Sequence, residues 1–152
     1  KKKTLIFPIN SEEKLTTMQE LLNHLLAEGF LTSTTKLFSF IDNNDKMIGS
    51  AVGRGVAFHH SCSTEVNEMI AVLGISKTGV DYQSPDRQNV HFVLLILDSI
   101  NEPNLHRKFI HRFQKFINKG DMKTKILDCE SKDEILSLID NWENDYLESV
   151  NI

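Results

Sequence analysis

The segment from Gly49 to His60 holds the residues of this sequence best suited to chemistry. Three glycines among residues 49–55 predict a close backbone bend, and residues 56–60 predict a strand that ends on His60. A neutral imidazole is nucleophilic near neutral pH, and its phosphoramidate keeps a transfer potential that a serine ester would lose. Phosphoryl transfer further needs positioning, and donors for the phosphoryl oxygens. These residue types therefore suit a histidine that relays a phosphoryl group, for which a second imidazole and a nearby hydroxyl would serve as donors.

Other interpretations of these residues stay open at this point. A histidine at a strand end is often only a polar surface residue, and the same holds for His106 near a helix start. His59, His60 and Cys62 are possible metal ligands, but neighbours in a strand point to opposite faces and a fourth ligand is missing. Cys62 and Cys129 form no CxxC motif and sit in no activating sequence. We therefore predict no metal, no cofactor and no cysteine nucleophile.

Length, charge and apolar content exclude several classes of protein. The chain has 152 residues, 40% of them hydrophobic, which suffices for one compact domain over residues 1–152 without disulfides. The net charge is -4 and no basic stripe is present, so nucleic acid is not an expected partner. No apolar run is long enough for membrane insertion. Two isolated cysteines favour a reducing, cytoplasmic location.

The periodicity of apolar residues predicts helices at both ends of the chain. Capping boxes are expected at Asn10 with Glu13 and at Ser131 with Glu134. The expected elements in chain order are a helix at 15–26, a short helix at 37–41, a polar loop at 42–46, a strand at 56–60, an apolar run at 69–75, a turn at 84–87, a central strand at 90–97, a helix at 105–117, a short segment at 126–127 and a helix at 135–146. Strands alternating with helices predict an α/β protein with a mixed β-sheet covered by helices on both faces.

Residues 44–60 resemble a known family. They read Asn-Asp-Lys-Met-Ile-Gly-Ser-Ala-Val-Gly-Arg-Gly-Val-Ala-Phe-His-His. Without a gap, they are similar to the segment Arg-Glu-x-x-x-Ser-Thr-x-Ile-Gly-x-Gly-Ile-Ala-Ile-Pro-His of enzyme IIA domains of the fructose/mannitol class of the bacterial phosphotransferase system, which includes nitrogen-regulatory members. The likeness continues through residues 79–97 and reaches His106, at the place of the family's second active-site histidine. It spans most of the chain.

The resemblance implies a three-layer α/β/α sandwich and a phosphocarrier function. His60 would accept a phosphoryl group from the histidine phosphocarrier protein, and His106 would stabilise that group by hydrogen bonding. Ser50 falls on the family's threonine and would supply a hydroxyl to the phosphate. Arg54 would supply positive charge, because Asn44 stands where the family has arginine.

Two functions follow from these matches and departures. The first is an active phosphocarrier, of the nitrogen-regulatory branch because no IIB-like segment follows in this sequence; a IIB component would be the partner in the sugar-specific branch. The second is a binding module of the same fold that transfers no phosphate and regulates a transporter or kinase by docking. Asn44, and His59 in place of the family's proline, favour the second.

Overall fold

The computed structural model describes residues 2–150, which form two compact units. One comprises residues 3–106 and the other residues 107–150 together with Lys2. The boundary falls within one helix, just after His106. The expectation of a single domain over residues 1–152 stays a prediction.

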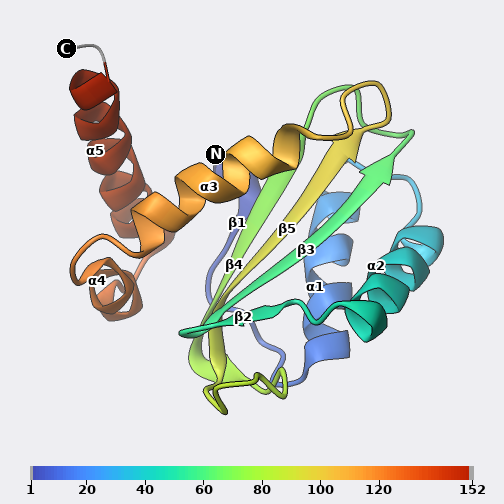
Figure 1. Cartoon of the computed structure of the whole chain (residues 1–152), viewed down its shortest axis with the longest axis horizontal. Coiled ribbons are helices and arrows are strands. Elements are labelled where there is room, and N and C mark those ends of the chain that lie inside the picture. The colour runs from blue at the N-terminus through green and yellow to red at the C-terminus, as the bar shows by residue number, and fades with distance from the viewer. Residues whose placement is uncertain (1, 151–152) are drawn as a thin grey trace. The chain divides into compact units, whose positions relative to one another are not determined.

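A mixed five-stranded sheet lies in the first unit (Figure 1). Its strands are β1 (Leu5–Ile6), β2 (Ala51–Gly53), β3 (Val56–Ser63), β4 (Ile70–Val80) and β5 (Val90–Ser99), in the order β1-β4-β5-β3-β2. The β1–β4 and β3–β5 pairs are parallel, whereas β4–β5 and β2–β3 are antiparallel. The nearly continuous apolar run at 90–97 is the central strand, as predicted, because only a strand buried on both faces needs such a run.

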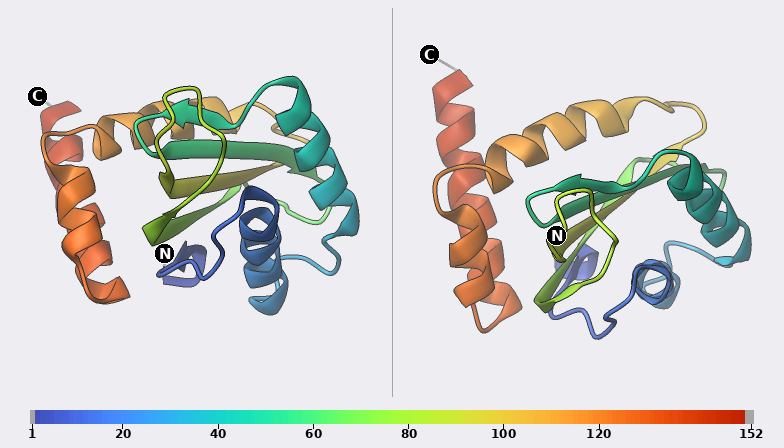
Figure 2. Two further views of the ribbon diagram at one scale, coloured as in Figure 1. Left: turned by 90° about the horizontal axis from the view of Figure 1, so that it is seen from below. Right: turned by 60° about the horizontal axis from the view of Figure 1, so that its bottom comes forward.

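Two helices of this unit pack against one face of the sheet. The short 3-10 turn Lys2–Thr4 leads into β1, after which α1 (Lys14–Ala27) contacts β4 and α2 (Thr35–Met47) contacts β3 (Figure 2). The apolar stripe of α1 is buried against alternate residues of β5, with Leu21, Leu25, Val93 and Leu95 in one core. This burial fixes which face of each strand looks toward the helices.

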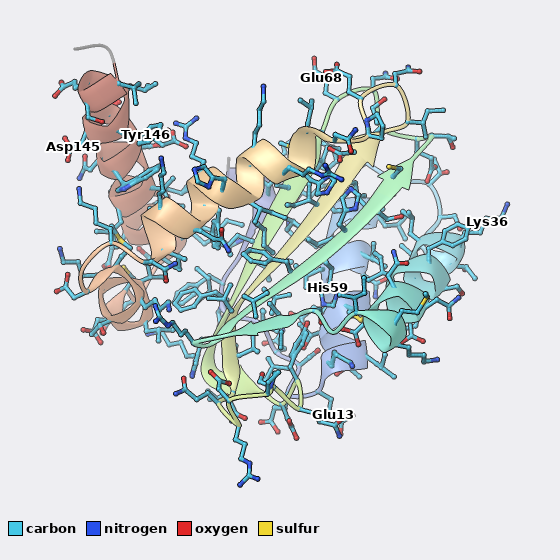
Figure 3. All side chains as sticks on the ribbon, in the orientation of Figure 1. Glu13, Lys36, His59, Glu68, Asp145 and Tyr146 are labelled. Carbon is cyan, nitrogen blue, oxygen red and sulfur yellow. The ribbon has the colours of Figure 1, made fainter. Side chains whose placement is uncertain are left out.

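The first predicted capping box is wrong by three residues. Helix α1 is capped by Glu13, which is labelled in Figure 3 and makes no side-chain capping bond. The backbone N–H of Asn10 instead donates to the Glu20 carboxylate, at 3.1 Å from Oε2. Glu20 thus ties the segment before the helix to the helix itself.

Residues 42–46 form helix and not the predicted polar loop. Helix α2 continues through them to Met47, because most of these polar side chains lie on its partly or fully exposed side while Asp45 turns inward and is 8% exposed. The expected alternation of strands and helices is also wrong in the middle of the chain, where β2 to β5 follow one another without a helix.

The second unit is helical. It holds most of α3 (Leu105–Ile117), then α4 (Met122–Asp128) and α5 (Lys132–Val150). The segment around residue 126 is therefore a helix. Ser131 accepts the backbone N–H of Glu134 at 3.2 Å, as expected of its capping box. Trp142 packs edge-on against Phe116 and stacks on Tyr146, which is labelled in Figure 3.

Sheet and helices together confirm the predicted α/β class with a mixed sheet. Within residues 2–150, no helix combines the length and the apolar character that a membrane span requires.

Candidate functional site

His60 stands on the face of β3 that points away from α1 and α2. Ala57 of β3 and Val93 of β5 belong to the core under these helices, so residues at even positions of both strands project to the opposite face. The parallel pairing aligns His60 with Ile96 and places Asp98 one same-face position further along the neighbouring strand. The predicted strand at 56–60 is confirmed and runs on to Ser63.

Asp98 joins the two predicted site histidines. Its Oδ2 lies 3.0 Å from Nε2 of His60 and 2.6 Å from Nδ1 of His106. Asp98 is 0% exposed, whereas the side chains of His60 and His106 keep 29% and 17% exposure. As an acceptor, the carboxylate assigns an N–H to each facing ring nitrogen when the rings are neutral. A buried acid thus fixes the orientation of two accessible imidazoles.

The start of α3 brings His106 over His60. The two rings stack with centroids 3.6 Å apart at an interplanar angle of 23°. The backbone N–H of His106 also points at Asp98 Oδ2, at 3.4 Å. A carboxylate at this place suits the unpaired amides and the positive dipole end of a helix. The turn between β5 and α3 therefore places His106 on the same carboxylate, Asp98, that contacts His60.

Burial and charge at the pair favour the neutral form of His60. Burial lowers the pKa of His60, the hydrogen bond and charge of Asp98 raise it, and the positive charge of His106 lowers it, with a net shift below the ordinary value. Burial and the charge of Asp98 raise the pKa of the Cys62 thiol, which disfavours its thiolate. An uncharged imidazole is the form that carries a nucleophilic lone pair.

His59, the neighbour of His60, belongs to the opposite face of the sheet. It is 3% exposed and its Nε2 lies 2.8 Å from the hydroxyl of Tyr82 (His59 is labelled in Figure 3). Burial lowers the pKa of His59 to about 4. The possible ligand set of His59, His60 and Cys62 is therefore not assembled, because its first member points into the core below α1 and α2.

Ser50 takes part in a second buried polar cluster. Its backbone N–H donates to Asp45 Oδ1 at 2.9 Å, its hydroxyl donates to the same oxygen, and Lys14 pairs with the other oxygen. Burial raises the pKa of Asp45, but the hydrogen bonds from Lys14 and Ser50 and the charge of Lys14 lower it more, so that it lies below its ordinary value. The Ser50 hydroxyl, which was expected to contact the phosphate, thus donates its hydrogen bond to Asp45 of α2.

Arg54 lies in the turn between β2 and β3. It has a left-handed backbone, with φ 56°, and its N–H donates to Asp86 at 2.8 Å. His60 lies four positions after Val56, the start of β3, which is about 13 Å at the rise of a strand. The turn is therefore at the far end of β3 from the histidine pair. Asn44, in place of the family's arginine, is exposed on α2.

Asp98 is the residue of the candidate site that the sequence did not predict. It follows directly after the apolar run of the predicted central strand. Polar residues at the carboxyl ends of neighbouring parallel strands gather at one edge of a sheet, and this signal was available for Asp98. The pairing of β3 with β5, which makes Asp98 a neighbour of His60, was not.

Comparison with known proteins gives a family match and sequence relatives. The profile of the family described as "Phosphoenolpyruvate-dependent sugar phosphotransferase system, EIIA 2" matches residues 1–142. A fructose-specific EIIABC component of Bacillus subtilis is 28% identical over 138 residues, which are 91% of this chain and 22% of that protein. The corresponding component of Mycoplasma pneumoniae is 29% identical over 85 residues, 56% of this chain and 12% of that protein. The chain thus spans about a fifth or less of the length of these relatives.

Solved structures share the fold. Nitrogen regulatory protein IIA-Ntr from Neisseria meningitidis superposes with a TM-score of 0.79 at 17% identity, covering 91% of this chain and 94% of that one. IIA mannitol from Escherichia coli gives a TM-score of 0.74 at 16% identity, covering 90% and 95%. The family profile covers nearly the whole chain and the fold agrees, so this chain belongs to the EIIA type 2 family of the phosphoenolpyruvate-dependent sugar phosphotransferase system.

Proposed function

We propose that the chain is a phosphoryl carrier that accepts a phosphoryl group on His60 from the histidine phosphocarrier protein. The observation that carries the proposal is the stacked pair of His60 and His106, both held by Asp98 in a chain of the EIIA type 2 family. Of the other expected site residues, Ser50 is hydrogen-bonded to Asp45 and Arg54 lies at the far end of β3.

The reaction at His60 is an in-line displacement. A ring nitrogen of His60 attacks the phosphorus of the donor's phosphohistidine, the new N–P bond forms as the donor's N–P bond breaks, and the leaving imidazole keeps the electron pair. The other ring nitrogen of His60 gives up its proton, and the other ring nitrogen of the leaving imidazole takes up a proton, so both rings end neutral. While Nε2 of His60 donates to Asp98, the lone pair is on Nδ1; attack by Nε2 requires this hydrogen bond to break first. Because its Nδ1 is on Asp98, a protonated His106 has its Nε2–H to offer to the phosphoryl oxygens.

The next acceptor we propose is a IIB component. A solved structure related to this chain in fold is a complex of enzyme IIA mannitol with phosphorylated enzyme IIB mannitol from Escherichia coli. The sequence relatives at 28% and 29% identity are fructose-specific components, which favours the sugar-specific branch. The nitrogen-regulatory branch and the cytoplasmic location stay predictions.

A specific observation also favours the second candidate function, a docking module without phosphotransfer. Asp98 sets a buried negative charge beside His60, while Asn44 replaces the family's arginine and Arg54 lies at the far end of β3. A phosphoryl group at His60 would thus meet an acid without these cations to offset it.

One experiment separates the two functions. The purified chain is incubated with phosphoenolpyruvate, enzyme I and the histidine phosphocarrier protein, and its intact mass is measured before and after acid treatment. We expect a gain of about 80 Da, lost in acid, as for a phosphoramidate. His60→Ala should show no gain, whereas His111→Ala, which changes an exposed histidine of α3, should behave as the wild type. No gain in the wild type, alongside a phosphorylated family member as positive control, refutes the carrier and leaves the docking module.

A further inference from the structure

Three possible ligands of a metal ion converge at the histidine pair. His60, Asp98 and His106 each offer one ligand atom, a ring nitrogen or a carboxylate oxygen, and these three atoms all lie within 4.8 Å of one another. They come from β3, β5 and the first turn of α3, and all three belong to the unit of residues 3–106. Two imidazoles, both partly exposed, and one carboxylate are the donor set of an open zinc site, whose fourth position is taken by water or substrate.

The distances among these atoms are close to those of a coordinated ion. Bonds of about 2.0–2.2 Å to a tetrahedral zinc ion put neighbouring ligand atoms about 3.3–3.6 Å apart. The observed separations from Asp98 Oδ2 are 3.0 Å to His60 and 2.6 Å to His106. An ion would therefore need both separations to lengthen and the two stacked rings, now 23° from parallel, to rotate so that each faces it.

The charge of the cluster also calls for a cation. Asp98 is 0% exposed, and among the residues that the structure describes its Oδ1 has no hydrogen-bond partner. A buried carboxylate is stable only when it is paired or bound to a metal. When both imidazoles are neutral, the cluster has a net negative charge, which a divalent ion would offset.

We propose that His60, Asp98 and His106 bind one divalent ion of the zinc class, and that this ion competes with phosphorylation of His60. Imidazole ligands select Zn²⁺, Co²⁺, Ni²⁺ or Cu²⁺ over Mg²⁺ and Ca²⁺. Coordination uses the lone pair of His60 Nε2 and keeps the ring proton on Nδ1, so neither nitrogen can attack phosphorus. The proposed metal site does not depend on the proposed function, whereas the competition with phosphorylation rests on the proposed function.

Metal binding is tested on the purified chain by titration with Co²⁺, followed by its visible absorption, and with Zn²⁺ by calorimetry. We expect one saturable site in the wild type. Substitution of residues that only hydrogen-bond to metal ligands weakens metal binding by about 10–100-fold. Loss of a ligand itself, in His106→Ala or Asp98→Asn, should therefore weaken metal binding by about 100-fold or more. His111→Ala and Cys62→Ser are the matched controls and should keep the affinity of the wild type. Circular dichroism establishes that each variant is folded.

Nuclear magnetic resonance of the ring nitrogens gives a readout that needs no phosphotransfer. Zn²⁺ should shift His60 Nε2 and His106 Nδ1 and leave the nitrogens of His111 unchanged. Absence of a saturable site, unchanged affinity in folded His106→Ala and Asp98→Asn, or shifts confined to other histidines would overturn the metal site.

The competition is measured in a single turnover with phosphorylated histidine phosphocarrier protein, after the chain is loaded with one equivalent of Zn²⁺ or Mg²⁺. Zn²⁺ should slow phosphorylation by at least about tenfold and Mg²⁺ should not, since only the former binds imidazole strongly. Equal rates with a loaded zinc site would overturn the competition. Absence of phosphorylation in the metal-free chain would instead refute the proposed function and leave the metal titrations to decide the site.

Discussion

Removal of the hydrogen bond between His59 and Tyr82 tests the assignment of His59 to the core. The residues are 3% and 5% exposed, and His59 Nε2 lies 2.8 Å from the Tyr82 hydroxyl. Tyr82→Phe leaves a buried ring nitrogen without its partner, at a cost of about 1–3 kcal/mol in the free energy of unfolding. His59→Leu leaves the hydroxyl unpaired at a similar cost. The double variant has no orphaned group, so it should lose about 1–2 kcal/mol less than the sum.

The four proteins are compared by urea unfolding at pH 7. Each kcal/mol corresponds to about 2–4 °C in Tm for a chain of this size, so heat unfolding gives a second reading. Tyr82→Phe should accept phosphate on His60 as the wild type does, because its hydroxyl serves the opposite face of the sheet. Additive losses, within about 0.3 kcal/mol, would refute the hydrogen bond as the reason for His59.

Three more predictions concern the anchor, the second polar cluster and one glycine. Asp98→Ala frees both rings and should slow phosphorylation of His60 by up to about 100-fold in single-turnover measurements; an unchanged rate contradicts its positioning role. Because the folded state lowers the pKa of Asp45, its ionised carboxylate stabilises the fold fully above the ordinary pKa near 3.8, and this stabilisation is lost as pH falls through the lower folded value. Asp45→Asn should therefore reduce the free energy of unfolding by about 2 kcal/mol at pH 7 and make stability fall less steeply in acid. Parallel plots of stability against pH for the two proteins would contradict this role of Asp45. Gly79→Ala should lower the free energy of unfolding in urea by about 1–3 kcal/mol, because φ of Gly79 is 94° and the new Cβ would lie 2.8 Å from Cβ of Asn89. Gly49→Ala is the control, since its Cβ meets open space, and it should change the free energy of unfolding by under about 0.5 kcal/mol. Equal effects of the two substitutions would show that the backbone conformation of Gly79 does not require glycine.

The parts of the fold that follow from local patterns were predictable. The apolar run at 90–97 gave the central strand, and the stripe at 105–117 gave α3. The end of α2 was not predictable in this way, because residues 42–46 are turn formers by composition. They stay helical because the Asp45 carboxylate pairs with Lys14 of α1, which lies 31 positions earlier in the sequence. A contact between residues so far apart leaves no local sequence pattern.

The candidate site was predictable in its histidines and not in its anchor. The resemblance predicted His60 and His106 as the site histidines, and the structure stacks their rings, while their roles stay predictions. Asp98 depends on the register between β3 and β5, which a single sequence does not reveal. Ser50 shows the converse, since its position matched the family while its hydroxyl is held by Asp45.

Site mapping of the phosphorylated chain tests the central claim most directly. The peptide that carries His59 and His60 is sequenced by electron-transfer mass spectrometry under conditions that preserve phosphohistidine. We predict the phosphoryl group on His60, because this ring is accessible and paired with His106 while its neighbour is buried on the other face. Phosphate on His59, on His106 without His60, or on no histidine would contradict the account.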